Sequence, residues 1–150
     1  MILNFPVDKA VKVVFTNNRN MHSDFSEDIH IIQNLKEYQV MAREKLTGIY
    51  IPMVTPFNKD ESINFNGIQE VTDFLVDNGV SGVIPSGSTG EMIALTPAEQ
   101  IAINTATVKA AAGRIKVVCS TGAYRTKDVV EMSIAAEAAG ADGIMAVTPW

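Results

Sequence analysis

The sequence has one cysteine, no long apolar run and no cluster of basic side chains. The single thiol, Cys119, excludes a disulfide framework and any cysteine-based zinc cluster. No unbroken apolar run reaches the roughly 18 residues of a membrane-spanning helix, so no membrane partner is expected. The 150 residues carry 12 basic and 17 acidic side chains, and this net charge of −5 argues against nucleic acid as a partner.

The first residues also lack the pattern of a secretory leader, which is a basic stretch followed by an apolar core and a small-residue cleavage site. We therefore expect a cytoplasmic protein. The hydrophobic content of 47% is that of an ordinary globular domain, which excludes wholesale disorder.

Glycine and histidine divide the chain near residue 46. All ten glycines lie between Gly48 and Gly143, whereas both histidines, His22 and His30, precede them. Residues 1–46 hold equal numbers of basic and acidic side chains, so residues 47–150 carry the whole net charge of −5. We therefore predict an N-terminal extension, 1–46, and a separate domain, 47–150.

Residues 47–150 alternate between short apolar segments and helical segments. The four apolar segments are rich in Val or Ile, as buried parallel strands are: Ile49–Val54, Val80–Pro85, Ile115–Ser120 and Gly143–Thr148. The three segments between them show helical spacing of apolar side chains and are expected to stop at Gly79, Gly113 and Gly140. They begin near Asn64, Thr96 and Thr126. This repeat predicts βα units that form a parallel sheet.

Two α/β architectures fit such a repeat, an open doubly wound sheet and a (β/α)8 barrel. A closed barrel needs about 250 residues, so the four strands and three helices predict either a small open domain or the N-terminal half of a barrel. Ligands bind at the carboxyl ends of the strands in both cases.

The loop after the second predicted strand carries the strongest functional signal. Two glycines, Gly87 and Gly90, flank the hydroxyls of Ser88 and Thr89. Glycines let backbone N–H groups converge on an anion, and the hydroxyls add donors for a carboxylate or a phosphate. A plain tight turn is the alternative. The loop is neither a P-loop, because no lysine follows Gly90, nor a dinucleotide-binding fingerprint.

Other candidate residues are weaker. Residues 47–150 contain no histidine, which excludes a Ser-His-Asp triad or a His-ligated metal there. Cys119 lies in an apolar strand and is expected to be a buried core thiol rather than a nucleophile. We interpret Tyr124 and Arg125 as a solvated loop pair, and Glu91 as a structural residue rather than a general base.

Three ordered motifs resemble the 4-hydroxy-tetrahydrodipicolinate synthase / N-acetylneuraminate lyase family. They are Gly48–Phe57 (GIYIPMVTPF), Gly87–Glu91 (GSTGE) and Val147–Trp150 (VTPW), with similar TPAE and AGADG segments between them. The resemblance covers residues 47–150 and none of residues 1–46. It implies a (β/α)8 barrel, a homotetramer, and a class I aldolase reaction in which pyruvate forms a Schiff base with a lysine and then attacks an aldehyde.

The resemblance also implies residue roles. Thr89 would bind the pyruvate carboxylate, and Ser88 would bind substrate and act catalytically in a hydroxyl relay. No cofactor and no metal ion are expected. None of Lys59, Lys109, Lys116 and Lys127 suits a desolvated site at a strand's carboxyl end. The resemblance implies that the family's lysine, which comes from the sixth strand, and its tyrosines lie beyond Trp150.

We therefore expect an inactive N-terminal fragment whose first and fourth strands are unpaired edges. Ser88 and Trp150 leave N-acetylneuraminate lyases and sugar-acid aldolases open as alternatives within the family. A non-catalytic carboxylate-binding module and a chain that pairs with a separate second half also remain open. Within residues 1–46, Ser26–Ala42 is expected to form an amphipathic helix, either as an oligomerisation arm or as a segment ahead of a true start at Met41.

Overall fold

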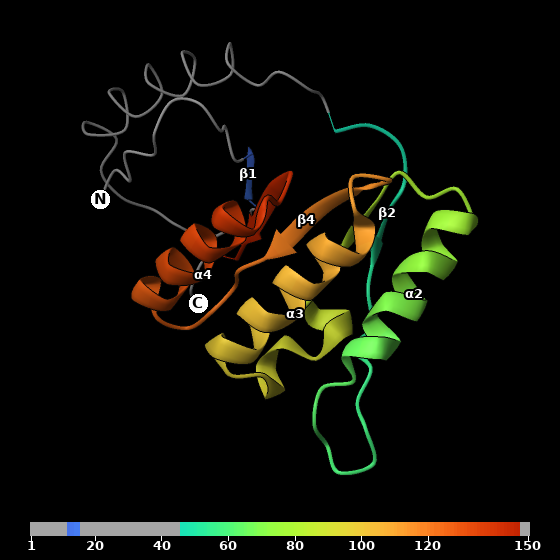
Figure 1. Ribbon diagram of the computed structural model, residues 1–150. Coiled ribbons are helices and arrows are strands. Elements are labelled where there is room, and N and C mark those ends of the chain that lie inside the picture. Colours follow the sequence, from blue (N-terminus) through green and yellow to red (C-terminus); the bar gives the residue numbers. More distant parts are fainter. Residues whose placement is uncertain (1–11, 16–45, 148–150) are drawn as a thin grey trace, which may run out of the picture.

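The computed structural model describes residues 12–15 and 46–147, which form one parallel sheet with helices packed on it (Figure 1). The elements are β1 (Lys12–Phe15), β2 (Tyr50–Pro52), α2 (Phe65–Asp77), β3 (Gly82–Ile84), η1 (Ser88–Gly90), η2 (Met92–Ala94), α3 (Pro97–Ala111), β4 (Lys116–Ser120), α4 (Thr126–Ala139) and β5 (Gly143–Ala146). The four predicted strands and three predicted helices are therefore present.

The helices begin where the capping residues place them. The Asn64 side chain accepts a hydrogen bond of 2.9 Å from the Gly67 N–H at the start of α2. At the start of α3, Thr96 and Glu99 form a reciprocal capping box ahead of Pro97. These local signals explain why both helix starts could be predicted from sequence.

The helix ends follow the glycine pattern with two corrections, and the first is that α2 ends at Asp77 with Asn78, not Gly79, as its cap. Gly140 ends α4 in the left-handed conformation, with φ of +91°. The cap of α3 is Ala112, with φ of +49°, and Gly113 follows it rather than forming the cap itself. The second predicted helix therefore ends at Ala111, two residues before the predicted glycine.

The sheet has one strand more than predicted. Its order is β1-β5-β4-β3-β2, and every neighbouring pair is parallel. The extra strand, β1, comes from the N-terminal extension and pairs along all of β5. The expectation that the fourth predicted strand is an unpaired edge is therefore wrong, and β2 is the outer strand on the other side of the described sheet.

All three helices lie over one face of the sheet in Figure 1, with α3 between α2 and α4. The core lies between these two layers. Strands β3, β4 and β5 contribute Val83, Val117, Cys119 and Ile144 to it. Ile68 of α2, Ile103 of α3 and Ala136 of α4 pack against them.

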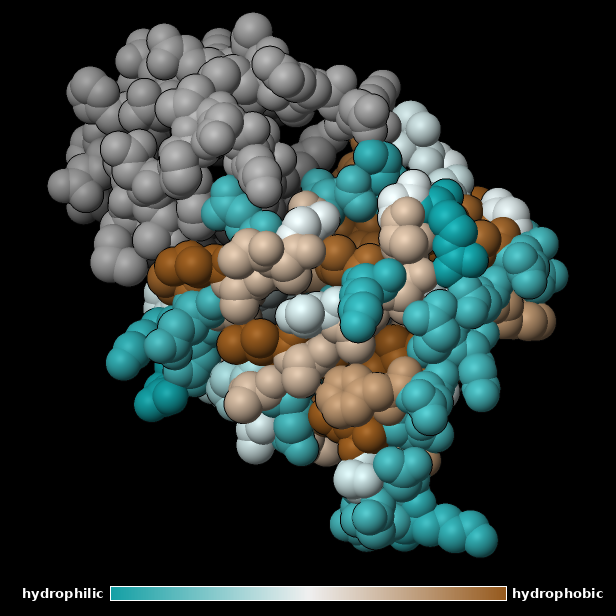
Figure 2. Space-filling model, viewed as in Figure 1, coloured by the Kyte–Doolittle hydropathy of each residue, from teal (hydrophilic) through white to brown (hydrophobic). Residues whose placement is uncertain are grey.

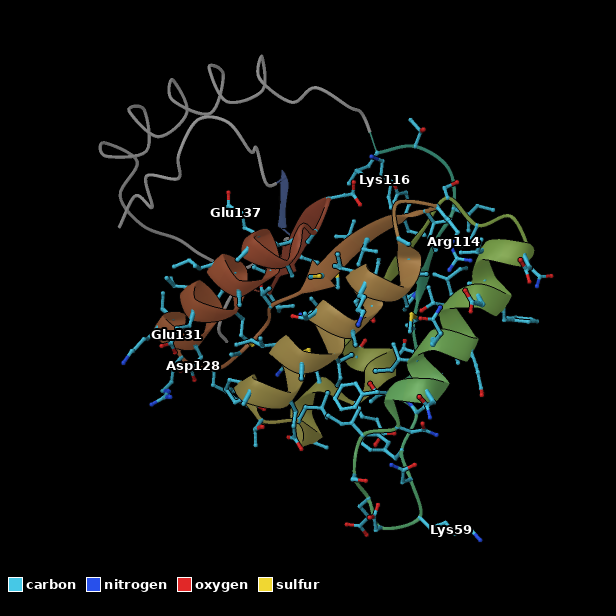
Figure 3. All side chains as sticks on the ribbon, in the orientation of Figure 1. Lys59, Arg114, Lys116, Asp128, Glu131 and Glu137 are labelled. Carbon is cyan, nitrogen blue, oxygen red and sulfur yellow. The ribbon has the colours of Figure 1, made fainter. Side chains whose placement is uncertain are left out.

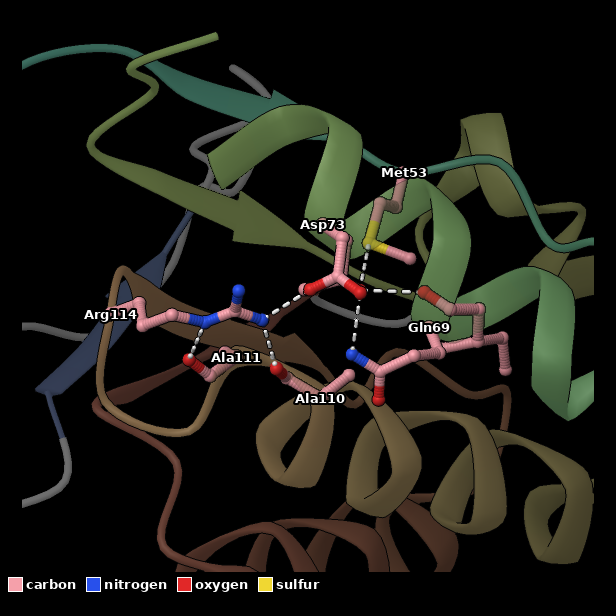
Figure 4. Close-up of polar contacts among 8 residues, drawn as sticks. Met53, Gln69, Asp73, Ala110, Ala111 and Arg114 are labelled. Atoms are coloured by element: carbon pink, nitrogen blue, oxygen red, sulfur yellow. Dashed lines mark hydrogen bonds and ion pairs between the residues drawn. The ribbon is translucent and has the colours of Figure 1, made fainter. Parts of the chain in front are cut away.

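Helices α2 and α3 are also joined by a polar contact at the surface (Figure 4). The Arg114 guanidinium contacts Asp73 and donates hydrogen bonds to the carbonyls of Ala110 and Ala111. Hydrogen bonds from Gln69 and then from Arg114 lower the pKa of Asp73. This contact fixes the loop between α3 and β4 against α2.

Several expectations fall outside the described residues. These are the helix over Ser26–Ala42, both histidines, the interpretation of Met41 as a start, and the end of the fourth predicted strand with Thr148–Trp150. The division of the chain at residue 46 stays a prediction. Within the described residues, no helix is long and apolar enough to cross a membrane.

Candidate functional site

The 86–91 loop leaves the carboxyl end of β3 and folds into one turn of 3-10 helix, η1. Ser86, Gly87 and Gly90 are buried, whereas Ser88 and Thr89 are exposed. The two residues singled out from the sequence therefore present their side chains to solvent at the ligand-binding edge of the sheet.

The loop closes on a single carbonyl group. The N–H groups of Gly90 and Met92 both donate to the Gly87 carbonyl, at 3.0 and 3.2 Å. Within the described part of the chain, neither the N–H groups nor the hydroxyls of Ser88 and Thr89 donate a hydrogen bond. Among the described residues, two backbone and two side-chain donors of this turn are thus without an acceptor.

Thr55, which follows β2, holds the far end of this loop. Its hydroxyl donates a hydrogen bond of 2.7 Å to the Gly90 carbonyl, and the residue is only 8% exposed. A Cβ atom at Gly90 would lie 3.0 Å from both the Met53 carbonyl oxygen and the Thr55 hydroxyl. Sequence reasoning missed this contact, whose one signal was that Thr55 also follows a predicted strand.

A pocket of about 240 Å³ lies beside the loop, between η2 and the start of α4. Its lining includes Met92, Ile93 and Leu95 on one side and Tyr124 with Asp128 on the other. Ser88 and Thr89 are not among the described residues that line it. The pocket is therefore distinct from the surface that carries the available donors.

The weaker candidates, Arg125, Tyr124 and Glu91, are ion-paired, exposed or part of a turn. Arg125 donates hydrogen bonds to both carboxylate oxygens of Asp128, at 2.7 and 2.8 Å, and these bonds lower the pKa of Asp128. Tyr124 is 66% exposed. Glu91 is exposed and joins η1 to η2 with a left-handed backbone.

Cys119 is a core residue, as predicted. Its side chain is fully buried within the cluster that joins the sheet to the helices. Burial, and secondarily the charge of Asp142, raises its pKa to about 12, so the thiol stays protonated at neutral pH and is a poor nucleophile.

The four lysines of residues 47–150 lie in polar surroundings. Lys59, Lys109 and Lys127 are exposed. Lys59 stands at the tip of a hydrophilic turn that projects from the molecule (Figures 2 and 3). Lys116, at the amino end of β4, pairs with Asp142 at 2.9 Å. None of these four lysines is buried at the carboxyl end of a strand.

Comparison with known proteins agrees with this geometry. Residues 45–150 match the family model described as "Dihydrodipicolinate synthetase family". The chain belongs to this family. A 4-hydroxy-tetrahydrodipicolinate synthase of Methanococcus maripaludis is 42% identical over 105 residues, which are 70% of this chain and 36% of that protein. The chain thus spans about a third of the length of the curated relatives it matches.

Two solved structures show the same fold over the same region. A dihydrodipicolinate synthase from Aquifex aeolicus superposes with a TM-score of 0.66 at 35% identity, covering 69% of this chain and 35% of that one. An N-acetylneuraminate lyase from Mycoplasma synoviae gives 0.68 at 32% identity, covering 72% and 38%. The fold is therefore that of the N-terminal half of a (β/α)8 barrel of the dihydrodipicolinate synthetase family, as the sequence predicted.

Proposed function

We propose that residues 47–150 form the carboxylate-binding half of a pyruvate-dependent class I aldolase of the 4-hydroxy-tetrahydrodipicolinate synthase type. The observation that carries this proposal is the 86–91 loop, which offers unpaired N–H and hydroxyl donors of Ser88 and Thr89 at the carboxyl end of β3. Thr89 binds the carboxylate of pyruvate, and Ser88 contacts the substrate and belongs to the hydroxyl relay of the complete enzyme.

The chemistry of the loop suits a carboxylate. Hydrogen bonds to a charged oxygen are shorter and stronger than those between neutral groups, and successive N–H groups at a turn form a concave site for an anion. A carboxylate has two oxygens, so it accepts from a backbone N–H and a hydroxyl together. The bond from Thr55 to the Gly90 carbonyl holds these donors in place before a ligand arrives.

We further propose that this chain binds pyruvate without turning it over. The reaction needs a lysine whose amine is neutral, and none of the four lysines in residues 47–150 is buried at the carboxyl end of a strand. The proposal therefore places the Schiff-base lysine and the relay tyrosines of the complete enzyme outside residues 47–150. Pyruvate and sodium borohydride should leave the chain's mass unchanged, and a reduced adduct on any of its lysines would contradict this.

Thr89→Val should weaken pyruvate binding by about 10- to 100-fold, because a hydrogen bond to a charged group is worth about 1.5–3 kcal/mol and each 1.4 kcal/mol is tenfold. Thr105→Val is the matched control, since Thr105 is an exposed threonine on α3 away from the loop. Isothermal titration with pyruvate measures both affinities. Equal affinity of the two variants would remove Thr89 from the site.

The aldehyde substrate is open between two classes. The structural similarity to an N-acetylneuraminate lyase and the serine at position 88 favour an N-acetylneuraminate lyase or a sugar-acid aldolase, whose aldehyde is a sugar, as the second candidate. A non-catalytic carboxylate-binding module is the third, and catalysis by a full-length barrel that contains this chain would exclude it.

We also propose that the protein is cytoplasmic and forms a homotetramer when complete. Large apolar side chains that remain exposed beside β2 support association, and they include Ile49 at 67% and Val54 at 53%.

A further inference from the structure

The residue that starts the 86–91 loop has an unusual backbone. Ser86 has φ of +48°, although it is not a glycine, and it is 1% exposed. Side chains with a Cβ atom avoid this left-handed region, so surrounding contacts must hold Ser86 there. The conformation matters for the site because Ser86 sets the direction in which Gly87 and the donors of Ser88 and Thr89 leave the strand.

Asn104, in the middle of α3, supplies those contacts. The Ser86 hydroxyl donates to Asn104 Oδ1 at 2.7 Å, and Asn104 Nδ2 donates to the Ser120 carbonyl oxygen at 2.9 Å. The second bond fixes the amide orientation, because only the NH2 group can face a carbonyl oxygen. One side chain thus ties the end of β3 to the end of β4.

Core packing alone does not explain an asparagine at this position. Asn104 is 1% exposed and lies on the face of α3 that packs on the sheet. A buried amide is costly unless its hydrogen bonds are made, and an apolar side chain would avoid that cost. The two hydrogen bonds of Asn104 go to Ser86, after β3, and to Ser120, at the end of β4. The buried amide therefore links the start of the loop to the neighbouring strand, which an apolar side chain could not do.

We propose that Asn104 is a positioning residue for carboxylate binding, which holds Ser86 in its left-handed conformation and so keeps the donors of Ser88 and Thr89 aligned. The inference rests on the proposed function for its ligand. Asn104 itself does not touch the substrate.

The test is Asn104→Leu in the 150-residue chain, with Thr107→Val as the matched control. Thr107 is also fully buried on α3, but its hydroxyl donates only within the helix, to the Ile103 carbonyl at 2.9 Å. Both variants therefore lose a buried polar group on the same helix, and only one loses the link to the loop.

The first measurement needs no ligand. Hydrogen exchange of the Gly90 and Met92 amides, which donate to the Gly87 carbonyl, should accelerate by about tenfold or more in Asn104→Leu relative to Thr107→Val. The second measurement is titration with pyruvate, whose affinity should fall by about fivefold or more in Asn104→Leu and stay within about twofold in the control. Ser86→Ala should reproduce both effects. If Asn104→Leu does not fold, Ser86→Ala is measured in its place.

The double variant Ser86→Ala/Asn104→Leu should show less than the sum of the two single effects, because each single variant already removes the bond between Ser86 and Asn104. If the hydrogen-exchange rates of the Gly90 and Met92 amides and the affinity for pyruvate equal those of the control, the positioning role is overturned. Acceleration spread evenly over α3 and β4 would overturn it too, because it would show a general loss of stability. If the unaltered chain does not bind pyruvate, the proposed function fails, and loop exchange alone decides the role of Asn104.

Discussion

Gly82→Ala is expected to destabilise the protein by about 3 kcal/mol, the upper end of the cost of adding a methyl group to a packed interior. Gly82 lies at the centre of three strands, paired with Tyr50 on one side and Lys116 on the other. A Cβ atom there would lie 2.3 Å from the Tyr50 ring and 2.7 Å from the Lys116 carbonyl oxygen. Because one of these obstacles is backbone, the strands themselves have to move apart.

Urea unfolding followed by circular dichroism measures this loss. Gly122→Ala is the matched control, since a Cβ atom at that buried glycine would meet its neighbours at ordinary distances of 3.5 Å or more. A midpoint for Gly82→Ala equal to that of the control would show that β2 and β4 do not approach Gly82 as described.

Ile68→Ala should cost about 2–5 kcal/mol, the range for truncating a large aliphatic side chain inside a core. Ile68 lies on α2, is fully buried, and belongs to the cluster that joins the helices to the sheet. The truncation leaves a cavity in the cluster between the helices and the sheet. The loss should therefore appear in the free energy of unfolding.

Ile134→Ala makes the same chemical change on α4 at a side chain that is 48% exposed. It should cost less than about 1 kcal/mol, because surface substitutions rarely cost more. Similar losses in the two variants would contradict the assignment of the core to the face between helices and sheet.

The helices and the loop could be predicted because their signals are local. Asn64 and the capping pair of Thr96 and Glu99 mark helix starts by their own hydrogen bonds. The strands of residues 47–150 were also found, with ends that extend up to two residues too far, because apolar runs continue past the last ladder bond.

The contacts that shape the site could not be predicted because they join distant residues. The bond between Thr55 and Gly90 spans 35 positions, and that between Ser86 and Asn104 spans 18. The local sequence around each residue does not indicate which distant residue it will contact. The strand β1 was missed for a related reason, since its four residues lie outside the βα repeat and are recognised only by pairing with β5.

The central claim is that the 86–91 loop holds the carboxylate of pyruvate. A titration of the uniformly ¹⁵N-labelled chain with pyruvate, followed by heteronuclear NMR, tests it most directly, because each backbone amide reports separately. The account predicts that the amides of Ser88 and Thr89 shift most and saturate together, while those of the pocket residues Ile93 and Tyr124 shift little. Shifts centred on that pocket, or none at the loop, would contradict the account.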